Sequence, residues 1–288
     1  MIKKFDTFMF FNELDTLQVR LETLYKHVDY FVLCEADKTH LGDDKPYYYE
    51  ENKELFAKYS DKIIHKKMQL KREDGWGKEN EQRYLISKVL RELDDPPQLG
   101  DLIFCSDLDE IWNPEMIREC YTNPYSFFNQ LHFIYFGNLW SGKAVTGTSV
   151  CTYETLLVLD KNYDNKGLQV LRNSKDFGPR IEGGGWHYSY ANGAKAVSQK
   201  CRSIAEGNKQ NLSKTSPESI QKDIDLALST LTSPYTPRRL KLFDFSQDKS
   251  AYLHYITAKN GGWVEEDAVF DICPKIDDKI LGKILHKK

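Results

Sequence analysis

The stretch DLIFCSDLDEIW (residues 101–112) joins an apolar run to a cluster of acidic side chains. Residues 102–105 are all apolar, a pattern typical of a buried β-strand. Asp107, Asp109 and Glu110 follow within a few positions. Carboxylates this close together repel one another and raise one another's pKa unless a cation or an array of hydrogen-bond donors lies among them. The stretch therefore predicts a strand whose end faces something positively charged.

Three more apolar runs precede this strand, and a segment with helical patterning follows each of them. The helical segments cover 15–28, about 51–59 and 78–94, and prolines at 96 and 97 stop the last one. Continuous apolar strands that alternate with helices are typical of a parallel sheet covered by helices. We therefore expect the order β-α-β-α-β-α-β. The preceding apolar runs are 5–11 (FDTFMFF), 29–37 (DYFVLCEAD) and 62–70 (KIIHKKMQL).

The pattern changes after Asp109. Two long strand-like runs, 125–138 and 149–159, have no helix pattern between them. The sheet is therefore expected to become mixed, with antiparallel strands. A glycine-rich loop is expected at 183–193 (GGGWHYSYANG), and helices at about 194–206 and 217–231.

The simplest organisation is one α/β domain over residues 1–245 with a C-terminal extension over residues 246–288. The extension ends in KIDDKILGKILHKK (275–288), which places Ile and Leu side chains on one helical face with lysines around them. We interpret this segment as a terminal helix that packs on the domain. A basic helix lying on a membrane surface is the alternative.

The composition of the 288 residues is that of an ordinary globular protein, 40% hydrophobic and 29% charged. The 40 basic and 43 acidic residues give a net charge of −3, which provides no general attraction to nucleic acid. The six cysteines form no CxxC pair, which argues against a disulfide scaffold or a zinc cluster and indicates a reducing compartment. The apolar stretch near the N-terminus is too short for a signal peptide or a membrane span. We expect a cytoplasmic protein with at most a peripheral membrane contact.

Polar side chains follow three of the predicted strands at their carboxyl ends. They are Asn12 and Glu13, Glu35, and the pair Asp107 and Asp109. In open α/β sheets, ligands bind beyond the carboxyl ends of the strands, so these side chains are expected along one rim. A D-x-D pair there offers oxygen ligands to Mg²⁺ or Mn²⁺, and such an ion can neutralise a departing diphosphate.

Phosphatases that use the first Asp of a D-x-D motif as a nucleophile offer another interpretation. Such enzymes usually carry the motif on the first strand of the domain, with Thr or Val two residues past the second Asp. Here three predicted strands precede the motif, and Ile111 occupies that position. The metal and diphosphate site is therefore favoured, and a phosphatase with Asp107 as nucleophile remains the alternative.

Four separated blocks resemble glycosyltransferase family 17, whose best-known members are the β-1,4-mannosyl-glycoprotein 4-β-N-acetylglucosaminyltransferases. The resemblance covers about residues 8–206. It implies a GT-A type fold, with a Rossmann-like mixed central sheet flanked by helices. It also implies a UDP-sugar donor (UDP-GlcNAc in the characterised members), dependence on Mn²⁺ or Mg²⁺, and inversion at the anomeric carbon. The blocks are residues 12–46, Trp76 with the segment 79–83 (ENEQR), 106–111 (SDLDEI) and 184–190 (GGWHYSY).

The resemblance assigns the metal and donor motif to Asp107 and Asp109. Asp109 is expected to contact the metal directly, and Asp107 to lie nearer the donor ribose or a metal-bound water. Glu110 belongs to the same block. We expect its carboxylate to cap the loop that shapes the motif.

Four more residues are expected on the donor side. Asn12, Glu13 and Glu35 match family positions near the nucleotide, although Glu13 could instead only favour the positive N-terminal end of the first helix. Arg83 is expected to pair with the donor diphosphate. Its alternative partner is Glu79, four residues earlier on the same predicted helix.

The glycine-rich block is expected on the acceptor side. Gly184 and Gly185 allow close approach of the backbone to a sugar. Trp186 is expected to stack on a sugar face or to pack in the core. His187 either completes the coordination of the metal or touches the acceptor, and His254 is the competing metal ligand.

An inverting transfer needs a general base that takes the proton from the acceptor hydroxyl. Glu182 is the predicted base, and Glu154 and Glu206 are the alternatives. The expected function is therefore metal-dependent transfer of GlcNAc from a UDP-sugar to a glycan or polysaccharide acceptor. A nucleotide-sugar-binding or carbohydrate-binding protein with little turnover is the alternative from another class.

Overall fold

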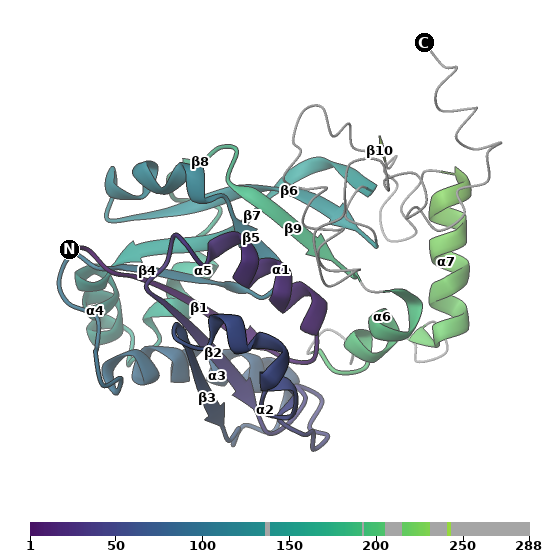
Figure 1. The fold of residues 1–288 in the computed structure, drawn as a ribbon, viewed down its shortest axis with the longest axis horizontal. Helices are drawn as coiled ribbons and strands as arrows, with labels where there is room; N and C mark the ends of the chain where they lie inside the picture. Colours follow the sequence, from purple (N-terminus) through teal and green to yellow (C-terminus); the bar gives the residue numbers. More distant parts are fainter. Residues whose placement is uncertain (136–138, 192, 205–214, 231–240, 243–288) are drawn as a thin grey trace, which may run out of the picture.

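The computed structural model describes residues 1–135, 139–191, 193–204, 215–230 and 241–242. Within these residues, ten strands form one sheet in the order β3-β2-β1-β4-β7-β6-β9-β5, with β10 beside β7 and β8 beside β6 (Figure 1). The elements are β1 Lys4–Phe10, α1 Leu14–Leu24, β2 Tyr30–Ala36, α2 Tyr48–Asn52, η1 Lys53–Tyr59, β3 Ile63–Met68, α3 Gly75–Arg91, β4 Leu102–Asp107, β5 Glu110–Trp112, η2 Pro114–Tyr121, β6 Tyr125–Ile134, β7 Leu139–Thr152, α4 Tyr153–Asn162, α5 Gly167–Asn173, β8 Arg180–Ile181, β9 Gly185–Ser189, α6 Gly193–Cys201, α7 Pro217–Thr230 and β10 Lys241–Leu242.

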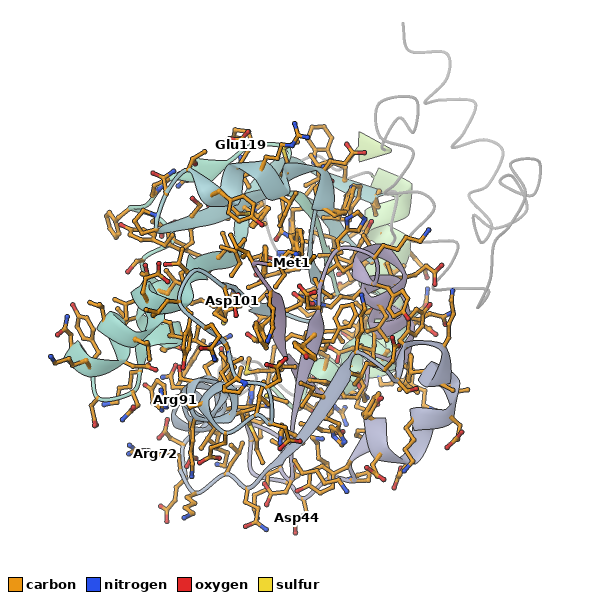
Figure 2. All side chains as sticks on the ribbon, turned by 60° about the vertical axis from the view of Figure 1, so that its left-hand side comes forward. Met1, Asp44, Arg72, Arg91, Asp101 and Glu119 are labelled. Carbon is orange, nitrogen blue, oxygen red and sulfur yellow. The ribbon has the colours of Figure 1, made fainter. Side chains whose placement is uncertain are left out.

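The first four strands along the chain are parallel, as the sequence predicts. β1 lies between β2 and β4, and β3 pairs with the outer side of β2. Phe8 and Phe10 of β1 pack in the cluster that includes α1, whereas Phe5 packs in the cluster that includes α3, α4 and α5. Side chains therefore fill both faces of the sheet (Figure 2). The expected β-α-β-α-β-α-β order is confirmed.

A hydrogen bond joins the amino ends of β1 and β4, at the opposite end of these strands from the acidic motif. The backbone N–H of Lys3 donates to Asp101 Oδ1 at 2.8 Å, near the position labelled in Figure 2. The pairing that follows sets Met9 opposite Asp107. The register of these two strands thus places the end of β1 beside the first acid of the D-x-D motif.

The sheet becomes mixed at β7, as expected, because β7 is antiparallel to both β4 and β6. The prediction that 149–159 is one strand is wrong, since β7 ends at Thr152 and α4 begins at Tyr153. Tyr153, Leu156 and Asp160 are the buried residues of α4, and their spacing is helical. A short apolar run fits either a buried strand or a helix, and its periodicity alone does not separate the two.

The prediction of a loop over 183–193 is also wrong in part, because Gly185–Ser189 forms β9 between β5 and β6. Gly185 has a φ of +117°, and a Cβ there would lie 2.3 Å from the carbonyl oxygen of Ile111. Only glycine combines this backbone conformation with so close an approach. The glycine therefore permits tight strand pairing in what the sequence presents as a loop.

The acidic turn, residues 107–110, joins the inner strand β4 to β5 at the far end of the strand order. β4 ends at Asp107 and β5 begins at Glu110, yet β5 stands at the far end of the strand order. Because two residues span little distance, the sheet must curl until β5 lies beside the end of β4. The backbone N–H of Tyr188 in β9 donates to the carbonyl oxygen of Asp109 at 2.9 Å. The curl thus brings β9 to the acidic motif.

A buried arginine from α1 supports this turn. Arg20 is 0% exposed, and its guanidinium donates to the two carboxylate oxygens of Asp6 at 2.6 and 2.7 Å. Its Nη1 also donates to the carbonyl oxygens of Asp107 and Leu108, each at 3.2 Å, and of Glu110 at 3.0 Å. Buried carbonyl groups need donors, and here one side chain supplies them to the turn. Arg20 thereby fixes the backbone that carries the motif.

Helices α6 and α7 pack together against the ends of β6 and β7. Val197 of α6 and Ile224 of α7 are buried in a cluster with Ile134 and Leu139. The predicted helices at about 194–206 and 217–231 are confirmed as elements. The packing of α6 places the ammonium of Lys200 3.2 Å from Glu13 Oε1, at the start of α1.

The expected C-terminal extension, residues 246–288, lies outside the described residues, as do Glu206 and His254. The division into a domain over 1–245 and an extension stays a prediction. No helix in the described part of the chain combines the length and apolar character that crossing a membrane requires. The described cysteines are all buried, and no disulfide joins any two of them.

Candidate active site

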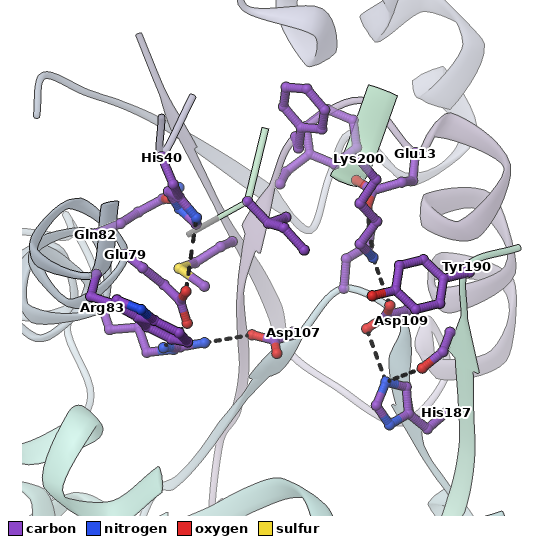
Figure 3. Close-up of a pocket in the computed structure, with 17 residues that line it drawn as sticks. Glu13, His40, Glu79, Gln82, Arg83, Asp107, Asp109, His187, Tyr190 and Lys200 are labelled. Atoms are coloured by element: carbon purple, nitrogen blue, oxygen red, sulfur yellow. Dashed lines mark hydrogen bonds and ion pairs between the residues drawn. The ribbon is translucent and has the colours of Figure 1, made fainter. Parts of the chain in front are cut away.

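A cavity of about 340 Å³ opens beside the acidic turn, beyond the carboxyl ends of β1 and β4 (Figure 3). The segments after β1 and after β2, helix α3, the acidic turn, β9 and α6 build its wall. Ligands of open α/β sheets bind in this position. The charged and aromatic residues that line it are Phe10, Phe11, Glu13, His40, Trp76, Glu79, Arg83, Asp107, Asp109, His187, Tyr190 and Lys200.

Asp107 binds two guanidinium groups that come from different helices. Its Oδ1 accepts from Arg83 Nη2 at 2.9 Å, and its Oδ2 accepts from Arg172 Nη2 at 2.7 Å. Burial favours the neutral acid, but the charges of Arg172 and Arg83 outweigh it and lower the pKa of Asp107. Arg83 also donates to Glu79 at 2.7 Å, which is one of its two expected pairings. The first acid of the motif is therefore ionised and held in place on both oxygens.

Glu110 caps the turn from inside, in agreement with its expected role. Its Oε2 accepts from the backbone N–H of Asp107 at 3.0 Å. Both of its oxygens accept from Arg172, each at 2.7 Å, in a two-pronged pairing. Glu110 is only 2% exposed, so it serves the shape of the turn and not the cavity.

Asp109 pairs with an ammonium group. Lys200 Nζ donates to Asp109 Oδ2 at 2.8 Å and lies 3.2 Å from Glu13 Oε1. His187 Nε2 lies 3.6 Å from Asp109 Oδ1. Burial disfavours both charges, but the attraction of Lys200 lowers the pKa of Asp109, and the attraction of Asp109 and Glu13 raises that of Lys200. The charged pair is thus a fixed part of the cavity wall.

His187 joins the cavity to a chain of hydroxyl and imidazole groups. Its Nε2 lies 3.1 Å from Ser189 Oγ, which lies 3.0 Å from His132 Nε2. His132 Nδ1 lies 2.8 Å from Ser141 Oγ. The other nitrogen of His187, Nδ1, is buried and has no hydrogen-bond partner among the described residues. Nε2 is therefore the nitrogen of His187 that faces the polar groups of the cavity (Figure 3).

The other end of the cavity is lined by α3 and by the segment after β2. His40 Nε2 lies 3.3 Å from Gln82 Oε1, and His40 Nδ1 lies 3.9 Å from Glu79. Burial lowers the pKa of His40, although the charge of Glu79 opposes this shift. The lowered pKa favours a neutral ring. Trp76 is 43% exposed at this end, and an exposed indole offers a face on which a base or a sugar can stack.

Five of the residues singled out from the sequence line this one cavity. They are separated by as many as 174 positions along the chain, and the sheet order and the curl bring them together. These residues are Glu13, Arg83, Asp107, Asp109 and His187.

Asn12 and Glu35, also expected near the nucleotide, do not line it. Glu35 is 0% exposed. Its carboxylate lies 3.0 Å from His65 Nε2 and accepts from the backbone N–H of Tyr49 at 3.3 Å, at the start of α2. Asn12 directly precedes Glu13, and its backbone N–H donates to that side chain at 3.2 Å. In this arrangement, both residues support the loops around the cavity.

The expected acceptor-side residues lie inside the sheet. Trp186 is 4% exposed and belongs to the main hydrophobic core, which matches the packing alternative for this residue. A Cβ on Gly184 would lie 2.7 Å from the backbone nitrogen of Asn129. Neither Gly184 nor Gly185 lines the cavity, and both instead allow neighbouring strands to approach closely.

The two expected bases that the structure describes, Glu182 and Glu154, do not line the cavity. Glu182 is exposed, and it accepts from Asn129 Nδ2 at 2.6 Å without lining the cavity. Glu154 accepts from the backbone N–H of Gly100, at the amino end of β4 and thus at the opposite end of that strand from the motif. Glu206 lies outside the described residues.

The fit of a metal ion depends on which ligands are available. Among the described residues, no group of three or more His, Cys, Asp and Glu side chains is arranged to hold a metal. Both oxygens of Asp107 are engaged by arginines, and Asp109 is paired with Lys200. The expected set of Asp107, Asp109 and His187 therefore does not fit a divalent ion as it stands. The positive charge that the acidic turn requires comes from the protein itself.

The residues missed from the sequence are the cations, Arg172 and Lys200, together with His40. Arg172 lies on the short helix α5, and Lys200 on α6, far along the chain from the acids that they contact. The one signal for them is the surplus of negative charge at residues 107–110. That surplus demands positive partners but does not say which of the 40 basic residues supply them.

Comparison with known proteins identifies the family. The model of glycosyltransferase family 17 matches residues 2–222, and no curated protein matches. The galactosyltransferase LgtC, in complex with donor and acceptor sugar analogs, overlaps with a TM-score of 0.35 and 8% identity, over 93% of this chain and 100% of that one. An active-site mutant of LgtC overlaps with a TM-score of 0.33 and 8% identity, over 92% and 98% of the two chains. Overlaps of this quality define neither a shared site nor a shared substrate.

A glycosyltransferase is the class of protein that these observations define. Because the match extends over most of its length, the chain belongs to glycosyltransferase family 17. The GT-A type fold expected from the sequence is confirmed as a curled, mixed α/β sheet with flanking helices. The D-x-D motif begins at Asp107, the last residue of its fourth parallel strand, β4.

Proposed function

We propose that this protein transfers a sugar from a UDP-sugar to a hydroxyl group of a glycan or polysaccharide, with inversion at the anomeric carbon. GlcNAc is the sugar that the resemblance to the mannosyl-glycoprotein N-acetylglucosaminyltransferases implies. One observation carries the proposal. A cavity at the carboxyl ends of parallel strands holds both acids of the motif, with Arg83 and Lys200 beside them.

The donor diphosphate would bind where these two cations line the cavity. Arg83 and Lys200 come from opposite walls, α3 and α6. Hydrogen bonds from guanidinium and ammonium groups to phosphate oxygens are among the strongest in proteins. Trp76, exposed at the α3 end of the cavity, provides a stacking face for the base or the sugar.

His187 is the best-placed general base in this proposal. The acidic side chains that line the cavity each have a cation within 3.2 Å, whereas His187 Nε2 has Ser189 Oγ at 3.1 Å and Asp109 at 3.6 Å. In the transfer, Nε2 takes the proton of the acceptor hydroxyl. The acceptor oxygen then bonds to the anomeric carbon, the bond from that carbon to the diphosphate breaks, and UDP leaves. The carboxylate of Asp109 stabilises the imidazolium that results.

His187 takes this role in place of Glu182, because Glu182 does not line the cavity. Dependence on Mn²⁺ or Mg²⁺ stays a prediction from the resemblance. If such an ion binds together with the donor, it would neutralise the departing diphosphate. No step assigned to the residues above passes through it, since Asp107 and Asp109 already have cationic partners.

Two measurements test the proposal, first the binding of nucleotides and then the release of UDP from a UDP-sugar. UDP should raise the melting temperature, because a ligand that binds only the folded state stabilises it, whereas GDP and CDP should do so less. UDP-GlcNAc should then release free UDP. No shift with any of the three nucleotides would overturn the proposal. A shift with UDP but no release from a panel of UDP-sugars would favour the binding protein without turnover.

A further inference from the structure

The ammonium of Lys200 stands between two carboxylates that would otherwise be the natural place for a cation. Nζ lies 2.8 Å from Asp109 Oδ2 and 3.2 Å from Glu13 Oε1. His187 Nε2 lies 3.6 Å from the other oxygen of Asp109. Carboxylates and imidazoles are ligand types that divalent ions accept, but with the ammonium among them these side chains are not arranged to hold a metal in the described part of the chain. Here one side chain of the protein occupies the centre of the group.

The fold holds Lys200 in this place. On α6, the neighbouring Val197 and Cys201 are 1% and 3% exposed and pack in the cluster formed with α7. Just beyond the helix, the backbone carbonyl of Ser203 accepts from the backbone N–H of His40 at 2.9 Å. Contacts on both sides therefore fix the end of α6 that carries Lys200. The ammonium is built into the site and is not a freely moving surface charge.

A divalent ion and this ammonium compete for the same oxygens. An Mg²⁺ ion bound to Asp109 Oδ2 at about 2.1 Å would lie within about 5 Å of Nζ. Like charges at that distance repel strongly in a partly buried site. The neighbouring Asp107 offers no alternative, because both of its oxygens are engaged by arginines.

We propose that Lys200 is the resident cation of this site, and that its ammonium keeps divalent ions out of the position formed by Glu13, Asp109 and His187. The free protein then carries its own counter-charge for the acidic turn. This inference concerns the protein without nucleotide. It stands or falls separately from the proposed transfer of a sugar.

The experiment is a titration with MnCl₂ alone, at pH 7.5, in which the electron paramagnetic resonance signal of free Mn²⁺ measures binding. Lys200→Met should bind Mn²⁺ at least tenfold more tightly than the wild type. Asp109→Asn added to Lys200→Met should remove that gain, because it removes a central ligand. Lys200→Arg keeps the charge and should show no gain. Lys195→Met is the matched control on an exposed position of the same helix and should behave as the wild type.

Equal Mn²⁺ affinity in the wild type and in Lys200→Met would overturn the proposal, as would a gain that survives Asp109→Asn. If Lys200→Met does not fold, a comparison of Mn²⁺ binding by the wild type and by Asp109→Asn tests the proposal instead. They should bind Mn²⁺ equally weakly, and tighter binding by the wild type would place a divalent ion at Asp109 and refute the inference.

Discussion

Arg20 Nη2 lies 2.6 Å from Asp6 Oδ1, and both side chains are completely buried beneath the acidic turn. The same guanidinium donates to three carbonyl oxygens of the turn. The candidate site therefore rests on a buried ion pair, which also sets the path of the backbone above it. Breaking such a pair by removing one partner is costly, because the other charge is left buried and uncompensated.

Arg20→Met should consequently lower the free energy of unfolding by about 3–5 kcal/mol. Urea denaturation followed by circular dichroism measures this difference. Arg72→Met is the control, because Arg72 is exposed, and it should change stability by less than about 0.5 kcal/mol. Equal effects of the two substitutions would contradict a structural role for the buried pair.

Asp107→Asn should destabilise the protein at neutral pH, and this effect should fade in acid. Arg172 and Arg83 hold the folded pKa of Asp107 below its unfolded value of about 3.9. A depressed folded pKa stabilises the fold above the unfolded pKa, and this stabilisation is lost as the pH falls toward the folded pKa. The difference from wild type should thus be constant above about pH 5 and shrink below about pH 4.

Guanidinium chloride unfolding at several pH values from 7 to 3 tests this. Asp94→Asn, at an exposed position, is the matched control and should show no such dependence. A difference between wild type and Asp107→Asn that is the same at pH 3 as at pH 7 would mean that the pKa is not depressed.

His187→Gln should reduce kcat by roughly 10²–10⁴-fold, the usual contribution of a general base. The KM for the UDP-sugar should change little, because the cations that face the diphosphate remain. His27→Gln, at an exposed position, is the control. A kcat within threefold of wild type for His187→Gln would return the role of base to another group.

Gly185→Ala should destabilise the fold rather than impair sugar binding alone. Its φ is +117°, and the added Cβ would lie 2.3 Å from the carbonyl oxygen of Ile111, so backbone must shift. We expect a loss of roughly 2–4 kcal/mol. Gly183→Ala is the comparison, since φ is +64° there but nothing lies within 4 Å of the new Cβ. It should cost only about 1–2 kcal/mol.

Urea denaturation of the two alanine variants separates the contributions of strain and contact. If Gly185→Ala were as stable as Gly183→Ala and lost only acceptor binding, the expected acceptor role of the glycine-rich block would regain support.

The first half of the fold could be predicted well because its strands are buried on both faces. Such strands appear as continuous apolar runs, and the amphipathic helices between them have a clear period. The run at 149–159 was misassigned for a related reason. It holds apolar residues on both sides of Tyr153, so its pattern does not mark the change from β7 to α4 there. The strand β9 was missed because its glycines suggest a loop, whereas they allow tight pairing.

The candidate site could be predicted only on its acidic side. Asp107 and Asp109 follow a recognisable strand, so their position at the rim follows from the local sequence. Glu182 and Gly184 are close in sequence to His187, yet only His187 lines the cavity. Which residue of a short segment faces a cavity depends on strand pairing, and the pairing of β9 with β5 and β6 is not visible in the segment itself.

The sequence by itself determined that a buried strand ends in an excess of negative charge and that a cation belongs there, because hydrophobic period and charge are local properties. Only the tertiary structure decided which cations they are. Arg83, Arg172 and Lys200 lie 24, 65 and 91 positions from the acids they contact. Ion pairs act through space and not along the chain. The curl of the sheet and the packing of α3, α5 and α6 therefore determine which cations contact the acids.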